Sequence, residues 1–253
     1  MNSLLLNNAS EIWLSSAIVI VTVLAFIAIA SGVTVRAVLN VKYHTYNSLK
    51  SKSGHTAFSV ARNLLDENGM ADVKVEKAKF FRRLFYGNRF STRTNTIYLR
   101  PNIIDSTSIV AVSTAIQKVG SVMQHKEGNS IFKFKSVFSP YMIFTSFLVL
   151  PLLVVALIFD FTFVLGGYLA TISVIFSLII FTIAILYTYI NIPVESRANK
   201  LAIELIDKTK VLDNDEKVVV KQIYTTYILA YVTEFIVSLL ELLKVTLALF
   251  LII

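Results

Sequence analysis

One ten-residue stretch, residues 115–124 (AIQKVGSVMQ), carries polar side chains at a spacing that suits chemistry. Gln117 and Ser121 stand four residues apart, so in a helix they share a face, and Lys118 lies between them in sequence. In the zinc-hydrolase motif H-E-x-x-H, these three positions hold two histidines that bind zinc and a glutamate that activates water. A carboxamide and a hydroxyl are poor zinc ligands, and a lysine has the wrong charge for a base beside a metal. The stretch therefore has the spacing of a zinc helix without its side chains.

The elements that would position this stretch belong to a membrane protein. Of the 253 residues, 55% are hydrophobic and 16% are charged. About 20 apolar residues suffice to cross a bilayer. We therefore expect a mainly α membrane protein with about four transmembrane helices and one large polar domain. The expected spans are residues 13–39, a hairpin over 139–190 made of 139–159 and 165–190, and an amphipathic or transmembrane helix over 223–253.

The distribution of charge predicts how the chain is oriented in the membrane. The net charge is +8, and residues 40–138 hold 16 Lys and Arg against 6 Asp and Glu. Several of these cations flank the predicted spans, as the positive-inside rule requires of cytoplasmic loops. We expect a multi-pass membrane protein with residues 40–138 in the cytoplasm and both termini outside. The same charges favour contact with anionic membrane lipids, and their placement gives no reason to predict binding of nucleic acid. The absence of cysteine excludes disulfides and thiolate metal sites.

The sequence of residues 40–138 predicts an α+β domain. Thr56 is a candidate N-cap and Gly69 a candidate C-terminal stop for a short helix. Ser106 or Asp105 is expected to cap the helix that carries the 115–124 stretch, and its apolar residues recur at helical spacing. Residues 191–222 form a second cytoplasmic segment, which contains Glu195 and a charged helix over 201–210. The elements expected in the domain are helix 57–68, strands 73–75 and 97–99, and helix 106–124.

Four sequence pieces, in the same order and at similar intervals, resemble the membrane zinc metallopeptidases of the YugP type. The pieces are SGHTAFSVAR at 53–62 with a following LLD and Gly69, RTNTIYL at 93–99, the helix stretch at 115–124, and PVESRA at 193–198. The resemblance covers roughly residues 53–250. It implies a zincin-like domain in which two helix histidines and a downstream glutamate bind zinc.

Placed on this chain, the family's ligand positions are occupied by Gln117, Ser121 and Glu195, and its general-base position by Lys118. Glu195 alone keeps the family's residue type. Arg197 stands where the family has an acidic residue after the third ligand. We therefore expect no metal or other cofactor, and we predict that Lys118 and Glu195 form an ion pair in place of the zinc site. A separation of more than about 6 Å between these side chains would contradict the ion pair.

Other residues offer alternative chemistry. His125, Glu127 and Glu195 are the candidates for a rebuilt metal site, although they lack ligand spacing. Ser121 and Lys118 are the candidates for a serine–lysine hydrolytic dyad, which the three-residue spacing on a helix produces often by chance.

The last apolar stretch contains charged residues. Glu234 and Glu241 are seven residues apart on one helical face, and Lys244 follows three residues later. Such residues within a membrane helix can mark an ion path. The alternative is a long amphipathic helix that packs against the cytoplasmic domain before it enters the bilayer.

These observations favour a catalytically inactive, zinc-metallopeptidase-like membrane protein that binds a protein partner or a membrane-protein segment, in a scaffold or quality-control role. Homo-oligomerisation would fit the same role. The first alternative is an active zinc metallopeptidase with an atypical site. The second alternative is a small transport or lipid-interacting protein, which rests on Glu234 and Glu241.

Overall fold

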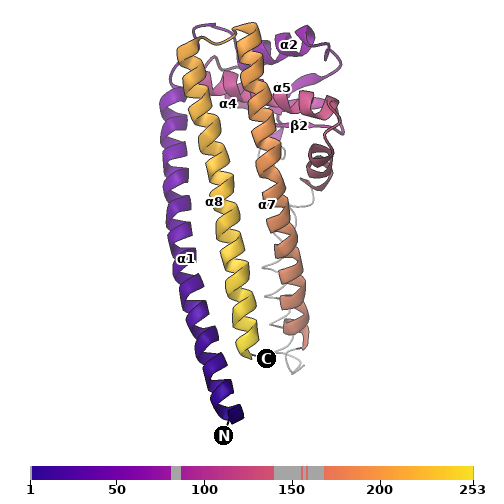
Figure 1. Cartoon of the computed structure of the whole chain (residues 1–253). Helices are drawn as coiled ribbons and strands as arrows, with labels where there is room; N and C mark the ends of the chain where they lie inside the picture. Colours follow the sequence, from indigo (N-terminus) through magenta and orange to yellow (C-terminus); the bar gives the residue numbers. More distant parts are fainter. Residues whose placement is uncertain (1, 81–86, 140–154, 156–157, 159–167, 253) are drawn as a thin grey trace. The chain divides into compact units, whose positions relative to one another are not determined.

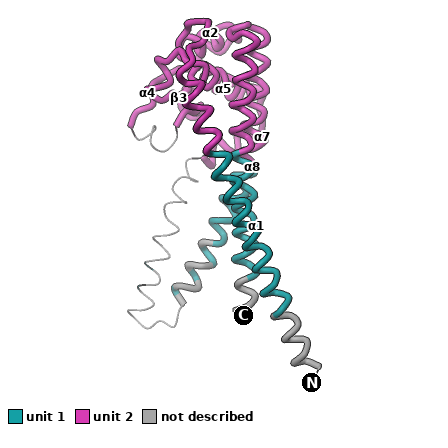
Figure 2. Tube along the Cα trace, turned by 90° about the vertical axis from the view of Figure 1, so that its left-hand side faces the viewer, with its two compact units in different colours: residues 1–36, 144–189, 230–253 teal, residues 37–143, 190–229 magenta. Residues whose placement is uncertain are grey.

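The structure is a computed structural model that describes residues 2–80, 87–139, 155, 158 and 168–252 (Figure 1). The chain divides into two compact units (Figure 2). The first unit consists of residues 1–36, 144–189 and 230–253, and the second of residues 37–143 and 190–229. The chain is mainly helical, with one small sheet, as the sequence predicts.

The first unit is built from long stretches of α1 (Asn2–Asn47), α7 (Tyr168–Thr209) and α8 (Asn214–Ile252). Among the described residues, two helical stretches, Ile12–Asn47 and Leu178–Thr209, are long and apolar enough to cross a membrane. Only 17% and 11% of their apolar windows are buried within the protein, so most of this apolar surface faces outward, as it does in lipid. Most of the predicted span 139–159 lies outside the described residues. The structure thus supports two of the four predicted spans.

The second unit packs helices against a three-stranded sheet. Strand β3 (Thr96–Leu99) is central, with β1 (Lys74–Lys77) parallel to it on one side and β2 (Arg89–Ser91) antiparallel to it on the other. Its own helices are α2 (Ala57–Glu67), the short α4 (Pro101–Ile104), α5 (Ile109–Lys126) and the helical residues 130–139. The ends of the three long helices that belong to this unit complete it.

Helix α2 follows from its sequence. The side-chain oxygen of Thr56 accepts a hydrogen bond from the Ser59 amide at 3.2 Å, which caps the helix as predicted. Gly69 then takes a positive φ of 66°, which ends the helix at little cost for a residue without a Cβ. The predicted helix over 57–68 is therefore confirmed, with a difference of one residue at its end.

The predicted start of the next long helix at residue 106 is wrong. Pro101 instead opens the short helix α4, and Ser108 caps α5 by accepting a hydrogen bond from the Ala111 amide at 3.1 Å. The prediction also missed β2, since three residues are too few to reveal a strand by alternation. A third difference is α7, which continues through Pro193 to Thr209, whereas the sequence suggested a separate helix over 201–210.

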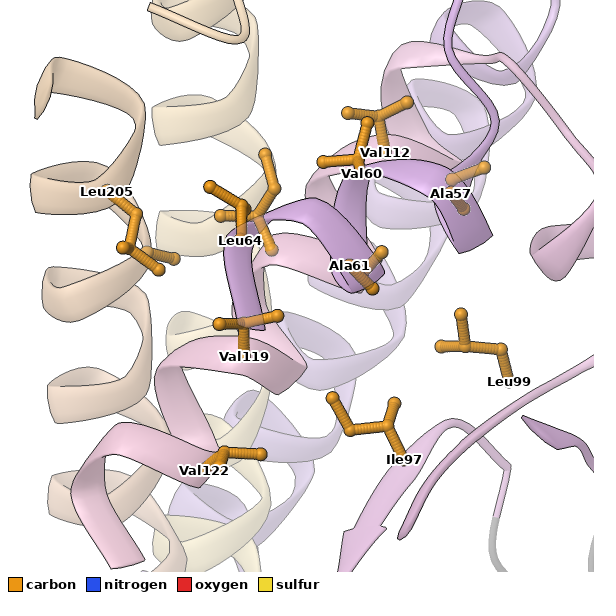
Figure 3. Packing of buried hydrophobic residues seen from close by; sticks show 14 of the residues in the cluster. Ala57, Val60, Ala61, Leu64, Ile97, Leu99, Val112, Val119, Val122 and Leu205 are labelled. Atoms are coloured by element: carbon orange, nitrogen blue, oxygen red, sulfur yellow. The ribbon is translucent and has the colours of Figure 1, made fainter. Parts of the chain in front are cut away.

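The core of the second unit lies between α2, α5, the sheet and the end of α7 (Figure 3). Helices α2 and α5 each turn an apolar face toward it, and the sheet contributes residues from β3. The labelled members that are fully or almost fully buried are Ala57, Val60, Ala61, Leu64, Ile97, Leu99, Val112, Val119, Val122 and Leu205. This core fixes α5, and with it the 115–124 stretch, against α7.

Gly120 sets the distance between α5 and α7. A Cβ at this position would lie 2.5 Å from the carbonyl oxygen of Ala198 and 3.3 Å from the amide nitrogen of Ala202. Both neighbours are backbone atoms of a helix, which cannot move aside as a side chain can. The absence of a side chain at residue 120 therefore allows the two helices to approach closely enough for their polar side chains to meet.

Substitution of Gly120 by alanine should destabilise the protein by about 1–3 kcal/mol, because the added methyl group forces α5 and α7 apart. Thermal unfolding in detergent, followed by circular dichroism, measures the change. Gly32→Ala is the control, since a Cβ there would come no closer than 3.3 Å, to a side-chain methyl group of Thr233. Equal effects of the two substitutions would contradict the special constraint at residue 120.

Candidate functional site

Glu195 lies at the centre of a cluster of polar side chains in the second unit. Its Oε2 atom lies 3.8 Å from the Nζ atom of Lys118 on α5, and its Oε1 atom lies 2.5 Å from the Nζ atom of Lys135. Gln117 Nε2 donates a hydrogen bond to Glu195 Oε2 at 3.2 Å. The structure thus brings Gln117, Lys118 and Glu195 together, as the sequence suggests, and adds Lys135 from the helical residues 130–139.

The cluster is largely removed from solvent. The side chains of Lys118, Glu195 and Lys135 are only 12%, 14% and 16% exposed to solvent. Gln117 Nε2 donates a second hydrogen bond, to Asn199 Oδ1 at 2.7 Å, so the carboxamide links two residues one turn apart on α7. Both amide protons of Gln117 are therefore used within the cluster.

Ser121 does not join the cluster. Its hydroxyl donates a hydrogen bond to the backbone carbonyl of Gln117 at 3.2 Å, one turn earlier on the same helix. Lys118 contacts Glu195. Among the described residues, no hydrogen bond links Ser121 to Lys118, so the alternative of a serine–lysine dyad gains no support.

Opposite charges hold the cluster together. Glu195 belongs to the second unit and lies beyond the predicted span, which ends at residue 190. Burial raises the pKa of the Glu195 carboxyl, but Lys118 and Lys135 outweigh burial and hold that pKa at about 2. Burial lowers the pKa of Lys118, Glu195 raises it, and Lys135 and Arg89 lower it further. One carboxylate thus faces more than one cation, and the surroundings of Glu195 are electropositive.

The remaining candidate ligands have other partners. Glu127 accepts hydrogen bonds from Arg197 at 3.0 and 3.2 Å. His125 packs in an aromatic group with Phe90 and Phe132, at ring distances of 5.7 and 5.9 Å. Within the described residues, no group of three or more His, Asp or Glu side chains could hold a metal ion. The alternative metal site of His125, Glu127 and Glu195 is therefore not formed there.

The charged residues of the last helix lie in the first unit and also form pairs. Glu234 Oε2 lies 3.7 Å from Arg36 Nη2, and Glu241 Oε2 lies 2.5 Å from Lys244 Nζ. Each carboxylate thus has its own cation. The alternative of an ion path along this face gains no support from these pairs.

Sequence reasoning missed Lys135 and Asn199. Asn199 is four residues after Glu195, so helical spacing would have placed it on the same face had α7 been predicted as continuous. Lys135 gives no comparable local signal. Its position depends on the turn at Gly128, where φ is 75°, which lets the chain reverse after α5.

Comparison with known proteins identifies the scaffold. A family model described as "Putative neutral zinc metallopeptidase" matches residues 18–250. The chain belongs to this family. It is also 30% identical over 223 residues to the "Putative membrane protease YugP" of Bacillus subtilis (strain 168), which covers 87% of this chain and 93% of that protein. No solved structure gives a significant match. The predicted resemblance is confirmed, and together with the two apolar helices it supports association with a membrane.

The family implies zinc, but the residues present do not fit it. Of the four positions concerned, Glu195 supplies a carboxylate, whereas Gln117 and Ser121 supply poor ligands and Lys118 a positive charge. Both oxygens of Glu195 already contact cations or an amide. A divalent cation placed here would have to displace the two lysines that balance the carboxylate.

Replacing Glu195 with glutamine should destabilise the protein by about 3 kcal/mol, because two poorly solvated ammonium groups lose their carboxylate. Unfolding in detergent measures the loss. Glu204→Gln, an exposed glutamate on the same helix, is the control and should have little effect. Adding Lys118→Met and Lys135→Met to Glu195→Gln should recover most of the stability. A Glu195→Gln variant as stable as the control would contradict the importance of the ion cluster.

Restoring the motif should restore metal binding if α5 has kept the geometry of a zinc helix. The triple variant Gln117→His, Lys118→Glu, Ser121→His is expected to purify with zinc, measured by mass spectrometry of the metal content. Adding Lys135→Met should tighten binding, since it frees Glu195. The single variant Ser121→His is the control and should bind no zinc. If the triple variant folds but purifies without zinc, α5 has kept the residue spacing of a zinc helix and not the geometry that binds the metal.

Proposed function

We propose that this chain is a catalytically inactive member of its peptidase family, which acts by binding a protein partner or a membrane-protein segment. The observation that supports this proposal is the pairing of Glu195 with Lys118 and Lys135. In a working site, a carboxylate at position 118 would accept a proton from zinc-bound water. Lysine at that position cannot supply that chemistry while it is protonated.

The proposed topology is that predicted from the sequence. The protein would cross a bacterial plasma membrane four times, with both termini outside and a zincin-like domain in the cytoplasm. The excess of Lys and Arg over residues 40–138 supports this orientation. The two helical stretches that are long and apolar enough to span support part of the count.

The sheet edge beside the cluster is the place we propose for a bound chain. Strand β2 lies at one edge of the described sheet, where it pairs with β3 on one side. It carries Arg89, whose charge acts on Lys118 of the cluster. Extended segments bind to proteins by adding a strand to such an edge, through backbone hydrogen bonds that need no metal. A scaffold or quality-control role follows from binding without cleavage.

The alternative function is that of an active metallopeptidase with an atypical or partner-completed site, and family membership favours it. Metal analysis of the purified protein distinguishes the two. We expect far less than one zinc per chain and no cleavage of a model protein substrate after zinc is added. Stoichiometric zinc that is lost in Glu195→Ala would overturn the proposal. Glu204→Ala serves as the control for nonspecific loss.

The binding role has its own test. A photo-crosslinking amino acid placed at Arg89, on β2, is expected to capture a polypeptide in native membranes. The same group at Glu67, an exposed residue at the end of α2, should capture none. Equal capture at both positions, or none at either, would contradict binding at the β2 edge.

A further inference from the structure

Helical residues 130–139 follow α5 and have two unlike faces. The segment begins after the turn at Gly128, and the Asn129 side chain accepts a hydrogen bond from the Phe132 amide at 2.9 Å, which caps it. Because the segment is helical, residues three and four apart share a face. Its side chains therefore form one set that contacts the rest of the second unit and another that points away from it.

The inner face carries two of the segment's polar residues, Lys135 and Ser136. Lys135 contacts Glu195 at 2.5 Å, and the Ser136 hydroxyl is hydrogen-bonded to that of Thr92 at 2.6 Å. Phe132 is buried on the same face, where its ring stacks on Phe90 of β2. The inner face thus covers the side of the Glu195 cluster next to β2.

The outer face is apolar and exposed. Four apolar residues on this face are 48%, 46%, 61% and 38% exposed to solvent: Ile131, Phe134, Val137 and Phe138. The rings of Phe134 and Phe138 stack on each other, with their centroids 4.3 Å apart. A helix at a water-exposed surface shows the reverse pattern, with apolar residues inward and polar residues outward. Such an inverted helix is suited to an apolar medium on its outer side.

The sequence around the segment indicates which apolar medium this is. Residue 139 begins an uncharged, mainly apolar stretch predicted to enter the bilayer, so the segment lies next to the membrane along the chain. Lys133 is exposed among the apolar residues, and a lysine there can reach anionic headgroups while its stem lies in the interface. A protein partner would not require this continuity.

We propose that residues 130–139 lie in the interface of the bilayer with their outer face in contact with phospholipid, while their inner face holds Lys135 against Glu195. The same short helix would then contact lipid on one face and supply a cation to Glu195 on the other. Loss of the lipid contact would free the segment to leave the second unit, and Glu195 would lose one of its two cations. This inference does not depend on whether the site is catalytically inactive.

Quenching of tryptophan fluorescence by brominated lipid tests the lipid contact. The chain has one tryptophan, so Trp13→Phe provides a silent background. In that background, Phe134→Trp and Phe138→Trp report on the outer face, and Phe132→Trp is the matched inner-face control. In vesicles of phosphatidylcholine brominated on the acyl chains, we expect at least about twofold quenching at 134 and 138 and little at 132.

Absence of quenching at both outer positions in folded protein would overturn the proposal and would point to a second copy or a protein partner on this face. Equal quenching at residue 132 would overturn it as well, because the inner face would then also contact lipid. Two outer positions keep the test decisive if one variant fails to fold.

Chemical labelling of lysines tests the connection to the cluster. Phe134→Asp combined with Val137→Asp should expel the outer face from lipid, so Lys135 in vesicles should react with an acylating reagent severalfold faster than in the unmodified protein. Lys74, exposed on β1, is the internal control and should react at the same rate in both. Unchanged labelling of Lys135, with the folded content preserved, would contradict the connection.

Discussion

The carboxylate of Glu195, paired with two ammonium groups, is the interaction on which the polar part of this protein depends. Each member comes from a different helical segment: Glu195 from α7, Lys118 from α5 and Lys135 from residues 130–139. Burying a charge without a partner costs several kcal/mol of folding free energy. Removal of any one of these three side chains therefore destabilises the protein through the charges that remain. The cluster therefore joins three parts of the chain through one group, and Gln117 ties the same group to Asn199.

The frame around the cluster is maintained by packing and not by the polar groups themselves. Gly120 allows α5 to approach the backbone of α7, and the neighbouring Val119 and Ala202 are fully buried. These contacts are made by apolar side chains and backbone atoms. They are therefore the same whether the facing polar side chains bind a metal or bind each other. A peptidase scaffold can consequently keep its shape while its polar residues change.

Part of this structure could be predicted from the sequence, and the reasons for the remainder are physical. Helix α2 was predictable because its caps, Thr56 and Gly69, act locally. The apolar periodicity of α5 identified its buried face, but periodicity does not say which segment packs there. Lys135 was missed because its place beside Glu195 is set by a chain reversal and by tertiary packing. Asn199 was missed because the sequence suggested a separate helix that begins at residue 201, whereas α7 continues through Pro193, as membrane-associated helices often do.

The electropositive surroundings of Glu195 also constrain how this sequence can change. If residue 118 alone became glutamate, two carboxylates would share Lys135, and one of them would be driven toward protonation. If residues 117 and 121 alone became histidine, Lys118 would still repel an incoming cation. A change at residue 118 alone would thus weaken the existing charge balance, and changes at residues 117 and 121 alone would leave a cation that repels the metal. A zinc centre here therefore requires residues 117, 118 and 121 to change together, so this arrangement of charges opposes its recovery by single substitutions.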